Sequence, residues 1–148
     1  MKRVIFTLLT IIWMLIIFMF SNQKSVTSTE NSQSLIRNTI VNIYKLFDKD
    51  ASQEKLDEIV QTFDVPVRKL CHFTEYFILG ILVLLMLKSY NINNIYLTIL
   101  ICFVYSCTDE FHQLFVPGRS GNIIDIIIDT SGSIFFTILY NLVCKRKK

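Results

Sequence analysis

Residues 4–20 form an uninterrupted apolar stretch, VIFTLLTIIWMLIIFMF, that carries no charged side chain. An α-helix needs about 20 mostly apolar residues to cross the ~30 Å hydrocarbon layer of a bilayer. The basic start MKR resembles that of a secretory signal peptide, but the bulky residues FMF at 18–20 occupy the place where a cleavage site requires small residues. We therefore predict an uncleaved membrane-spanning anchor.

Three further apolar segments follow, at 70–87, 95–107 and 123–143. The middle one is short, and it reaches a spanning length only if its helix continues to about residue 114, which draws charged residues to membrane level. Composition agrees, since 52% of the 148 residues are hydrophobic, 18% are charged and the mean hydropathy is +0.47. A short buried helix in a soluble fold is the disfavoured alternative. We predict an all-α polytopic membrane protein, a four-transmembrane-helix bundle in one domain over 1–148, with spans at about 4–20, 70–87, 95–114 and 123–143.

Residues 21–69 differ in character and are predicted to form an extracytoplasmic loop. Its first part, 21–34, is rich in Ser, Thr and Asn, and we predict that it is an exposed linker. Two short amphipathic helices are expected next, the second capped at Asp50 and ended at Pro66, because proline suits a first helical turn and would open the following span. Their apolar stripes are Ile36, Ile40, Ile43 and Phe47 in the first helix, and Leu56, Ile59, Val60 and Phe63 in the second.

Basic residues near the span ends predict the orientation. One side holds Lys2, Arg3, Lys88 and the tail Lys145-Arg146-Lys147-Lys148, and the other holds Lys24, Arg68, Lys69 and Arg119 close to helix ends. The excess on the first side places both termini in the cytoplasm. No basic patch interleaved with aromatic residues points to nucleic acid, the four cysteines lack metal-ligand spacing, and we expect no cofactor.

Polar residues recur near the same predicted end of three spans. Spacings of i, i+3 and i+4 in the second and third spans, and of i and i+4 in the fourth, put several of them on one helical face. The residues are His72, Glu75 and Tyr76 in the second span; Asp109, His112 and Gln113 in the third, with Glu110 rotated by about 100°; Asp125 and Asp129 in the fourth; and Arg119 in the loop VPGRSGN.

The free energy of burying these acids indicates that they face one another. A carboxylate at the membrane centre costs on the order of 2.5 kcal/mol or more. Glu75, Asp109, Glu110, Asp125 and Asp129 together would cost roughly 12 kcal/mol, which is comparable with the stability of a whole domain. We therefore expect them to contact each other, the basic side chains or water. A polar network that only locks the four helices together is the alternative.

The string DEFHQLFVPGRSGNIIDIIIDTSG at 109–132 closely resembles the signature of the VanZ-like family of small bacterial membrane proteins. Two other blocks, RKLCHFTEYFILG at 68–80 and FSNQKSVTSTENSQS at 20–34, are similar to that family's remaining motifs. The positions that match are Ser21, Gln23, Lys69, His72, Glu75, Tyr76, Gly80, Asp109, Glu110, His112, Gln113, Pro117, Gly118, Arg119, Asp125, Asp129 and Gly132. Position 129 departs from the pattern, because asparagine is common there in the family.

The resemblance implies a multi-pass protein of the bacterial cytoplasmic membrane with a role in the cell envelope. The family's namesake is linked to low-level resistance to the glycopeptide teicoplanin, but no established reaction accompanies the family. The resemblance therefore implies an envelope context without naming the chemistry.

Two main functions remain open. In the first, an outer-facing pocket binds a membrane lipid or the headgroup of a lipid-linked cell-wall intermediate, with Arg119 and Lys69 on a phosphate. In the second, a membrane-embedded hydrolase or transferase uses Glu75, His112, Asp109 or Glu110 for acid–base catalysis, with Arg119 holding the developing charge. The predicted pocket consists of Lys69, His72, Glu75, Tyr76, Asp109, Glu110, His112, Gln113, Arg119, Asp125 and Asp129.

Two other chemistries are less favoured. Neither His-x-x-Glu nor Asp-x-x-His is a specific ligand pattern, so we predict no metal site. Intramembrane carboxylates also suit proton-coupled transport, but four helices without repeat symmetry make it the weakest hypothesis.

Overall fold

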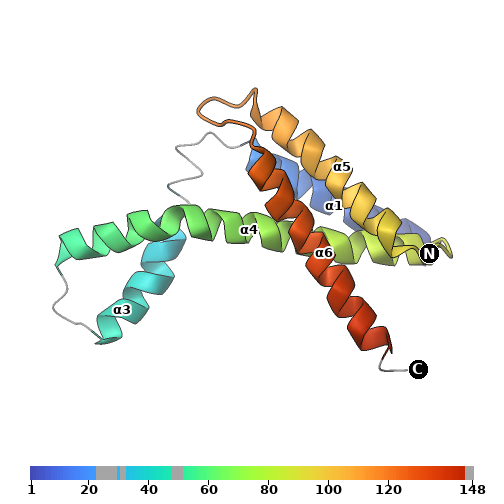
Figure 1. The fold of residues 1–148 in the computed structure, drawn as a ribbon, viewed down its shortest axis with the longest axis horizontal. Helices are drawn as coiled ribbons and strands as arrows, with labels where there is room; N and C mark the ends of the chain where they lie inside the picture. The colour runs from blue at the N-terminus through green and yellow to red at the C-terminus, as the bar shows by residue number, and fades with distance from the viewer. Residues whose placement is uncertain (23–29, 31–32, 48–51, 146–148) are drawn as a thin grey trace.

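The computed structural model describes residues 1–22, 30, 33–47 and 52–145, and it is helical throughout, with no strand in those ranges. The predicted all-α class is confirmed. In chain order, the elements are α1 (Lys2–Ser21), the π-helical segment η1 (Arg37–Val41), α3 (Asn42–Phe47), α4 (Gln53–Ser89), α5 (Ile95–Gln113) and α6 (Ile123–Lys145) (Figure 1).

Three helices are long and apolar enough to cross a membrane, namely α1, α4 and residues 123–143 of α6. Helix α5 has 19 residues, which corresponds to roughly 28 Å, but its last two turns are polar. It begins at the Asn94 cap, whose side chain accepts a 3.1 Å hydrogen bond from Leu97 N, and it ends at Gln113. The fourth span therefore stays a prediction.

The prediction that Pro66 ends one helix and opens the next is wrong. Helix α4 runs unbroken for 37 residues with Pro66 inside it. Its cap is Ser52, whose Oγ accepts a 3.3 Å hydrogen bond from Lys55 N, whereas the predicted cap Asp50 lies outside the described residues. An internal proline costs a helix about 3 kcal/mol, so contacts on both sides of it must hold the helix together.

Part of that support comes from a small apolar cluster beside the N-terminal half of α4. Ile36 packs there against Leu56 and Val60, with Tyr44 and Val67 at the edge. The first loop helix predicted from the sequence corresponds in position to η1 and α3, and η1 contacts α4. The second one is not separate, because its residues form the N-terminal part of α4. Of the other stripe residues, Ile43 and Phe63 are exposed, and the side chains of Ile40 and Phe47 lie outside the described set.

The main core lies where α1, α5 and α6 pack on the C-terminal half of α4. The C-terminal ends of α1 and α5 and the N-terminal end of α6 come together beside the middle of α4 (Figure 1). Tyr76, Leu79 and Val83 of α4 are buried there against Ile17 and Cys102. Large apolar side chains cover the outward faces of α1 and α6, as expected for helices that meet lipid.

Two glycines let α4 and α6 approach closely. A Cβ added at Gly80 would lie 3.2 Å from Ser133 Cα, and one at Gly132 would overlap the backbone carbonyl of Phe73. Small residues at such crossings are common where membrane helices pack through their backbones. Gly132 lies one turn beyond Asp129, so this crossing also fixes the position of the polar residues.

Candidate functional site

The polar site lies where four helices meet, and the loop between α5 and α6 closes one side of it. This loop turns at Gly118, whose φ of 81° favours glycine. A Cβ at Gly121 would lie 2.6 Å from Glu110 O, so the returning chain passes directly against the end of α5. The two helix ends that carry most of the predicted site residues are thereby held together.

Three acids form a buried cluster, which we name the carboxylate cluster: Asp109 and Glu110 from α5 and Asp129 from α6. Their side chains are 3%, 4% and 1% exposed, and one oxygen from each lies within 4.8 Å of the others. At an effective dielectric constant of about 20, two unit charges at that distance repel by roughly 3 kcal/mol. All three cannot be anionic together without a compensating positive charge.

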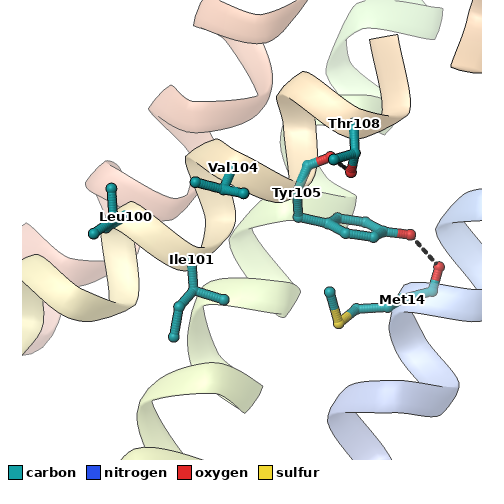
Figure 2. A pocket seen from close by; sticks show the side chains of 6 residues that line it. All are labelled: Met14, Leu100, Ile101, Val104, Tyr105 and Thr108. Atoms are coloured by element: carbon teal, nitrogen blue, oxygen red, sulfur yellow. Dashed lines mark hydrogen bonds between the residues drawn. The ribbon is translucent and has the colours of Figure 1, made fainter. Parts of the chain in front are cut away.

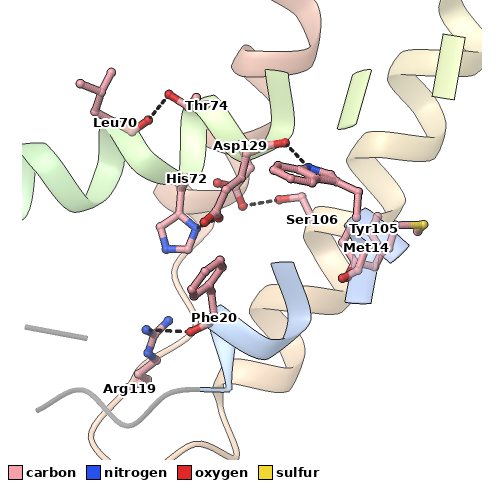
Figure 3. Close-up of polar contacts among 11 residues, drawn as sticks. Met14, Phe20, Leu70, His72, Thr74, Tyr105, Ser106, Arg119 and Asp129 are labelled. Atoms are coloured by element: carbon pink, nitrogen blue, oxygen red, sulfur yellow. Dashed lines mark hydrogen bonds and ion pairs between the residues drawn. The ribbon is translucent and has the colours of Figure 1, made fainter. Parts of the chain in front are cut away.

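Two of these acids each accept a hydrogen bond at one carboxylate oxygen. Ser106 Oγ donates to Asp129 Oδ2 at 3.0 Å, a contact drawn in Figure 3, and the backbone N–H of Asn122 donates to Glu110 Oε2 at 2.8 Å. Glu110 thereby ties the end of α5 to the start of α6. Both oxygens of Asp109 and Oδ1 of Asp129 are buried without a hydrogen-bond partner.

Three further polar groups surround Asp109. Ser21, at the end of α1, and Gln113 lie against its carboxyl group, and the phenol of Tyr76 faces both Asp109 and Asp129. Ser21 and Tyr76 are fully buried and Gln113 is 5% exposed, yet Ser21 Oγ, Tyr76 Oη and Gln113 Nε2 have no hydrogen-bond partner. Buried polar atoms in native proteins are usually paired, so these groups form a polar lining able to make further hydrogen bonds.

A second layer of polar residues is more accessible. Lys69 Nζ lies 3.2 Å from Asp125 Oδ1, and these side chains are 36% and 30% exposed. His72 Nδ1 lies 3.3 Å from Glu75 Oε2, a contact without good hydrogen-bond geometry, and each side chain is 18% exposed. The structure thus pairs Lys69 of α4 with Asp125 of α6, and it places His72 beside Glu75 one turn further along α4.

Arg119 lies in the α5–α6 loop and is half-buried, and its guanidinium donates a long 3.5 Å hydrogen bond to Phe20 O at the end of α1 (Figure 3). Burial, together with the nearby charge of Arg68, lowers the pKa of Arg119 from its ordinary value. A guanidinium stays protonated under such a shift. Arg68, Lys69 and Arg119 form what we call the cationic rim.

His112 is placed differently from the sequence expectation. The face of α5 that is buried holds Asp109, Glu110 and Gln113, whereas His112 lies at its edge and stacks on Phe18 with ring centroids 4.5 Å apart. Glu110, which helical geometry rotates away from Asp109, turns inward because its carboxylate accepts a hydrogen bond from the N–H of Asn122. Within the described part of the chain, no hydrogen bond or ion pair joins His112 to a carboxylate, and its buried Nδ1 has no hydrogen-bond partner.

The sequence analysis did not identify two residues of the site. Ser106 is buried and holds Asp129, and Trp13 of α1 donates a 3.0 Å hydrogen bond from Nε1 to Glu75 O. Ser106 lies three residues before Asp109 and shares its helical face, which is a signal that could have identified it. Trp13 gave no such signal, because a single tryptophan inside an apolar span is indistinguishable from a packing residue.

Two apolar grooves flank α1. One has a volume of about 340 Å³ and is lined by Trp13, Leu70, Cys71, Thr74, Glu75 and Ile78, so it runs up to the polar layer. The other, of about 400 Å³, lies between α1 and α5 and is lined by Met14, Leu100, Ile101, Val104, Tyr105 and Thr108 (Figure 2). At its floor, Tyr105 Oη donates a 2.6 Å hydrogen bond to Met14 O. Both grooves are shaped for apolar chains.

Apolar helices of spanning length that enclose a polar cluster define a helical membrane protein. The chain belongs to the VanZ/LLP1 family, whose profile matches residues 6–144, nearly its whole length. Comparisons with curated proteins and with solved structures gave no match. Of the positions carried over from the family resemblance, Gln23 lies outside the described residues, and Ser21 lies against the carboxylate cluster.

Proposed function

We propose that this VanZ-like protein binds the phosphate-bearing headgroup of a membrane lipid or a lipid-linked cell-wall intermediate. In this proposal the chain crosses the bacterial cytoplasmic membrane four times, with both termini inside and the polar site toward the outer face. The ligand's hydrocarbon chain lies in the groove beside α1, and its headgroup meets the cationic rim.

One observation carries the proposal: the apolar groove of Trp13, Leu70 and Ile78 ends at the polar layer, at Glu75. An apolar groove that adjoins a charged side chain suits an amphiphile, whose apolar chain and polar headgroup would meet the two parts. The neighbouring charges fit the polar end of such a ligand. The nearby charge of Arg68 helps to lower the pKa of Arg119, and a bound phosphate would offset that repulsion.

The envelope context supports the same reading. The family's namesake is linked to teicoplanin resistance, and glycopeptides act on cell-wall intermediates at the outer face of the membrane. A protein that engages such an intermediate would alter glycopeptide susceptibility without modifying the drug. We therefore expect a change in teicoplanin susceptibility when the protein is expressed in a suitable host.

A second candidate is a membrane-embedded hydrolase or transferase acting on a lipid-linked substrate. It is favoured by the contact of His72 Nδ1 with Glu75 Oε2 at 3.3 Å, because a histidine beside a carboxylate can exchange protons with a substrate. His72 is better placed for this role than His112, which stacks on Phe18. Arg119 would then stabilise charge on a transferred phosphoryl group.

The test is a binding titration of the purified full-length protein in detergent, with a polyprenyl phosphate and the uncharged polyprenol of equal length as probes. We expect the phosphate to bind at least about tenfold more tightly, and Arg119→Ala to remove most of that difference. Arg37→Ala is the matched control, since Arg37 pairs with the exposed Asp57 at the far end of α4. Equal binding of the two probes would refute the headgroup proposal, and phosphate release abolished by Glu75→Gln would favour the enzyme.

A further inference from the structure

The carboxylate cluster has the composition of a cation site. One oxygen from each of Asp109, Glu110 and Asp129 lies within 4.8 Å of the others, and all three side chains are buried. Two oxygens on opposite sides of a Ca²⁺ ion lie about 4.8 Å apart, since each bond is about 2.4 Å, and Mg²⁺ and Mn²⁺ need somewhat less. Carboxylate oxygens are the ligands that these hard cations prefer.

The hydrogen bonds around the cluster leave oxygens available for a cation. Asn122 N–H donates to one oxygen of Glu110, and Ser106 Oγ donates to one oxygen of Asp129. These bonds fix the orientation of the two carboxylates, as outer-shell donors do in metal sites. Oδ1 of Asp129 and both oxygens of Asp109 are buried and unpaired. Each acid can thus present an oxygen to one central ion.

Independent support comes from side chains outside the cluster. The hydroxyl oxygens of Ser21 and Tyr76 are fully buried, lack a hydrogen-bond partner, and lie beside Asp109. These atoms come from α1 and α4, so all four long helices contribute an unpaired or anionic oxygen. Hydroxyl oxygens are weaker ligands than carboxylates, but they suit the same hard cations.

The helix dipoles also favour positive charge here. Asp109 and Glu110 are in the last two turns of α5, and Ser21 ends α1, so two negative helix ends converge here against one positive end, that of α6. Acids placed at helix C-termini are disfavoured unless a cation compensates them. Among the described residues, the ion pairs join Lys69 to Asp125, His72 to Glu75 and Arg37 to Asp57. None includes a cluster acid, although His72 and Arg119 are near enough to interact electrostatically with the cluster.

We propose that Asp109, Glu110 and Asp129 bind one divalent cation of the oxygen-preferring class, Mg²⁺, Mn²⁺ or Ca²⁺, with Ser21 and Tyr76 beside it. This proposal revises the sequence expectation of no metal site. It does not depend on headgroup binding, because the proposed ligands are distinct from the residues of the cationic rim and come from the protein alone. The competing arrangement is a metal-free cluster in which shared protons neutralise the acids.

The test is titration of the purified full-length protein in detergent with Mn²⁺, followed by electron paramagnetic resonance of the free ion. We expect about one saturable Mn²⁺ per chain, displaced by Mg²⁺ or Ca²⁺, and at least about tenfold weaker binding in Asp109→Asn and Asp129→Asn. Asp57→Asn, which alters an exposed acid paired with Arg37, should bind as the unaltered protein does. No saturable binding, or binding unchanged in both cluster variants, would overturn the proposal.

A second readout does not rely on the variants folding. The chain has a single tryptophan, Trp13, whose indole is hydrogen-bonded to Glu75 O beside the site. Tb³⁺ is a hard ion whose emission is sensitised by a nearby indole, so the unaltered protein should give Trp-excited emission that Mg²⁺ or Ca²⁺ abolishes. Bound Tb³⁺ without that emission would place the ion elsewhere and contradict the proposal. No lipid probe is present, so failure of headgroup binding leaves this result unaffected.

Discussion

Ser106 on α5 donates a 3.0 Å hydrogen bond to Asp129 on α6, and both side chains are buried. This contact joins the two helices whose ends carry most of the acids. It also fixes the orientation of the Asp129 carboxylate, one oxygen of which lies within 4.8 Å of an oxygen of Asp109 and of Glu110. A serine with no evident motif therefore shapes the most strongly charged part of the protein.

Removing the Ser106 hydroxyl should destabilise the folded protein. We expect Ser106→Ala to lower the free energy of unfolding by roughly 1–3 kcal/mol, because a buried carboxylate loses its donor. Ser131→Ala is the matched control, since Ser131 Oγ donates only to Ile128 O in its own helix. Thermal unfolding in detergent measures both. Equal melting temperatures for the two variants would mean that the Ser106–Asp129 bond contributes little.

The crossing of α4 and α6 should tolerate no side chain at Gly132. A methyl group there would overlap Phe73 O, whereas one at Gly80 meets Ser133 at 3.2 Å, a contact that small shifts can relieve. We expect Gly132→Ala to reduce the melting temperature and the membrane abundance of the protein more than Gly80→Ala does, with a cost on the order of 1–3 kcal/mol. The reverse order would contradict the close approach at this crossing.

The unbroken helix α4 makes a prediction about Pro66. Within a continuous helix, Pro66→Ala restores a backbone donor and removes a steric clash, so it should stabilise the protein by up to about 3 kcal/mol. If proline instead opened a new helix, the same change would be neutral or slightly destabilising. Thermal unfolding of Pro66→Ala therefore distinguishes the two arrangements directly.

The four-span topology has its own test. Reporter fusions after Lys148 and near Ser28 should fall on opposite sides of the membrane, because an odd number of spans separates them. Of the two fusions, the one after Lys148 should be the cytoplasmic one. Fusions on one side would exclude four spans and would leave only the three helices of evident spanning character.

The sequence predicted the all-helical class correctly, because long apolar runs are a strong signal, and the functional site stays a prediction. Long apolar runs and the cost of buried charge lead directly to a helical membrane protein with clustered acids. Pro66 misled the prediction because local propensity ignores the contacts of Leu56 and Val60 that keep α4 continuous. Ser106 was missed because a lone serine on a helix carries no chemistry until its partner, Asp129, is known.

The direction of the side chains was the second feature that the sequence could not predict. Helical geometry gives angles between neighbouring residues but does not say which face is buried. Glu110 points inward because the chain returns at Asn122 and donates its N–H, and His112 is left to stack on Phe18. Both facts depend on how the α5–α6 loop folds back, which no spacing within α5 contains.

The substitution Arg119→Lys separates binding from catalysis. Lysine keeps the positive charge but loses the planar pair of donors. If the site only binds a headgroup, the variant should retain part of its effect on glycopeptide susceptibility. If the guanidinium stabilises a transition state, the variant should be nearly inactive. A variant indistinguishable from the unaltered protein would remove Arg119 from both roles.

The central claim is that polar residues from separate helices form one functional site, and a comparison of single and double variants tests it most directly. Glu75→Gln and Arg119→Ala should each abolish the effect on teicoplanin susceptibility while membrane abundance stays near normal. The double variant should be no worse than either single one, because residues that act as a unit are non-additive. Losses that add, or that merely follow the amount of protein in the membrane, would contradict the account.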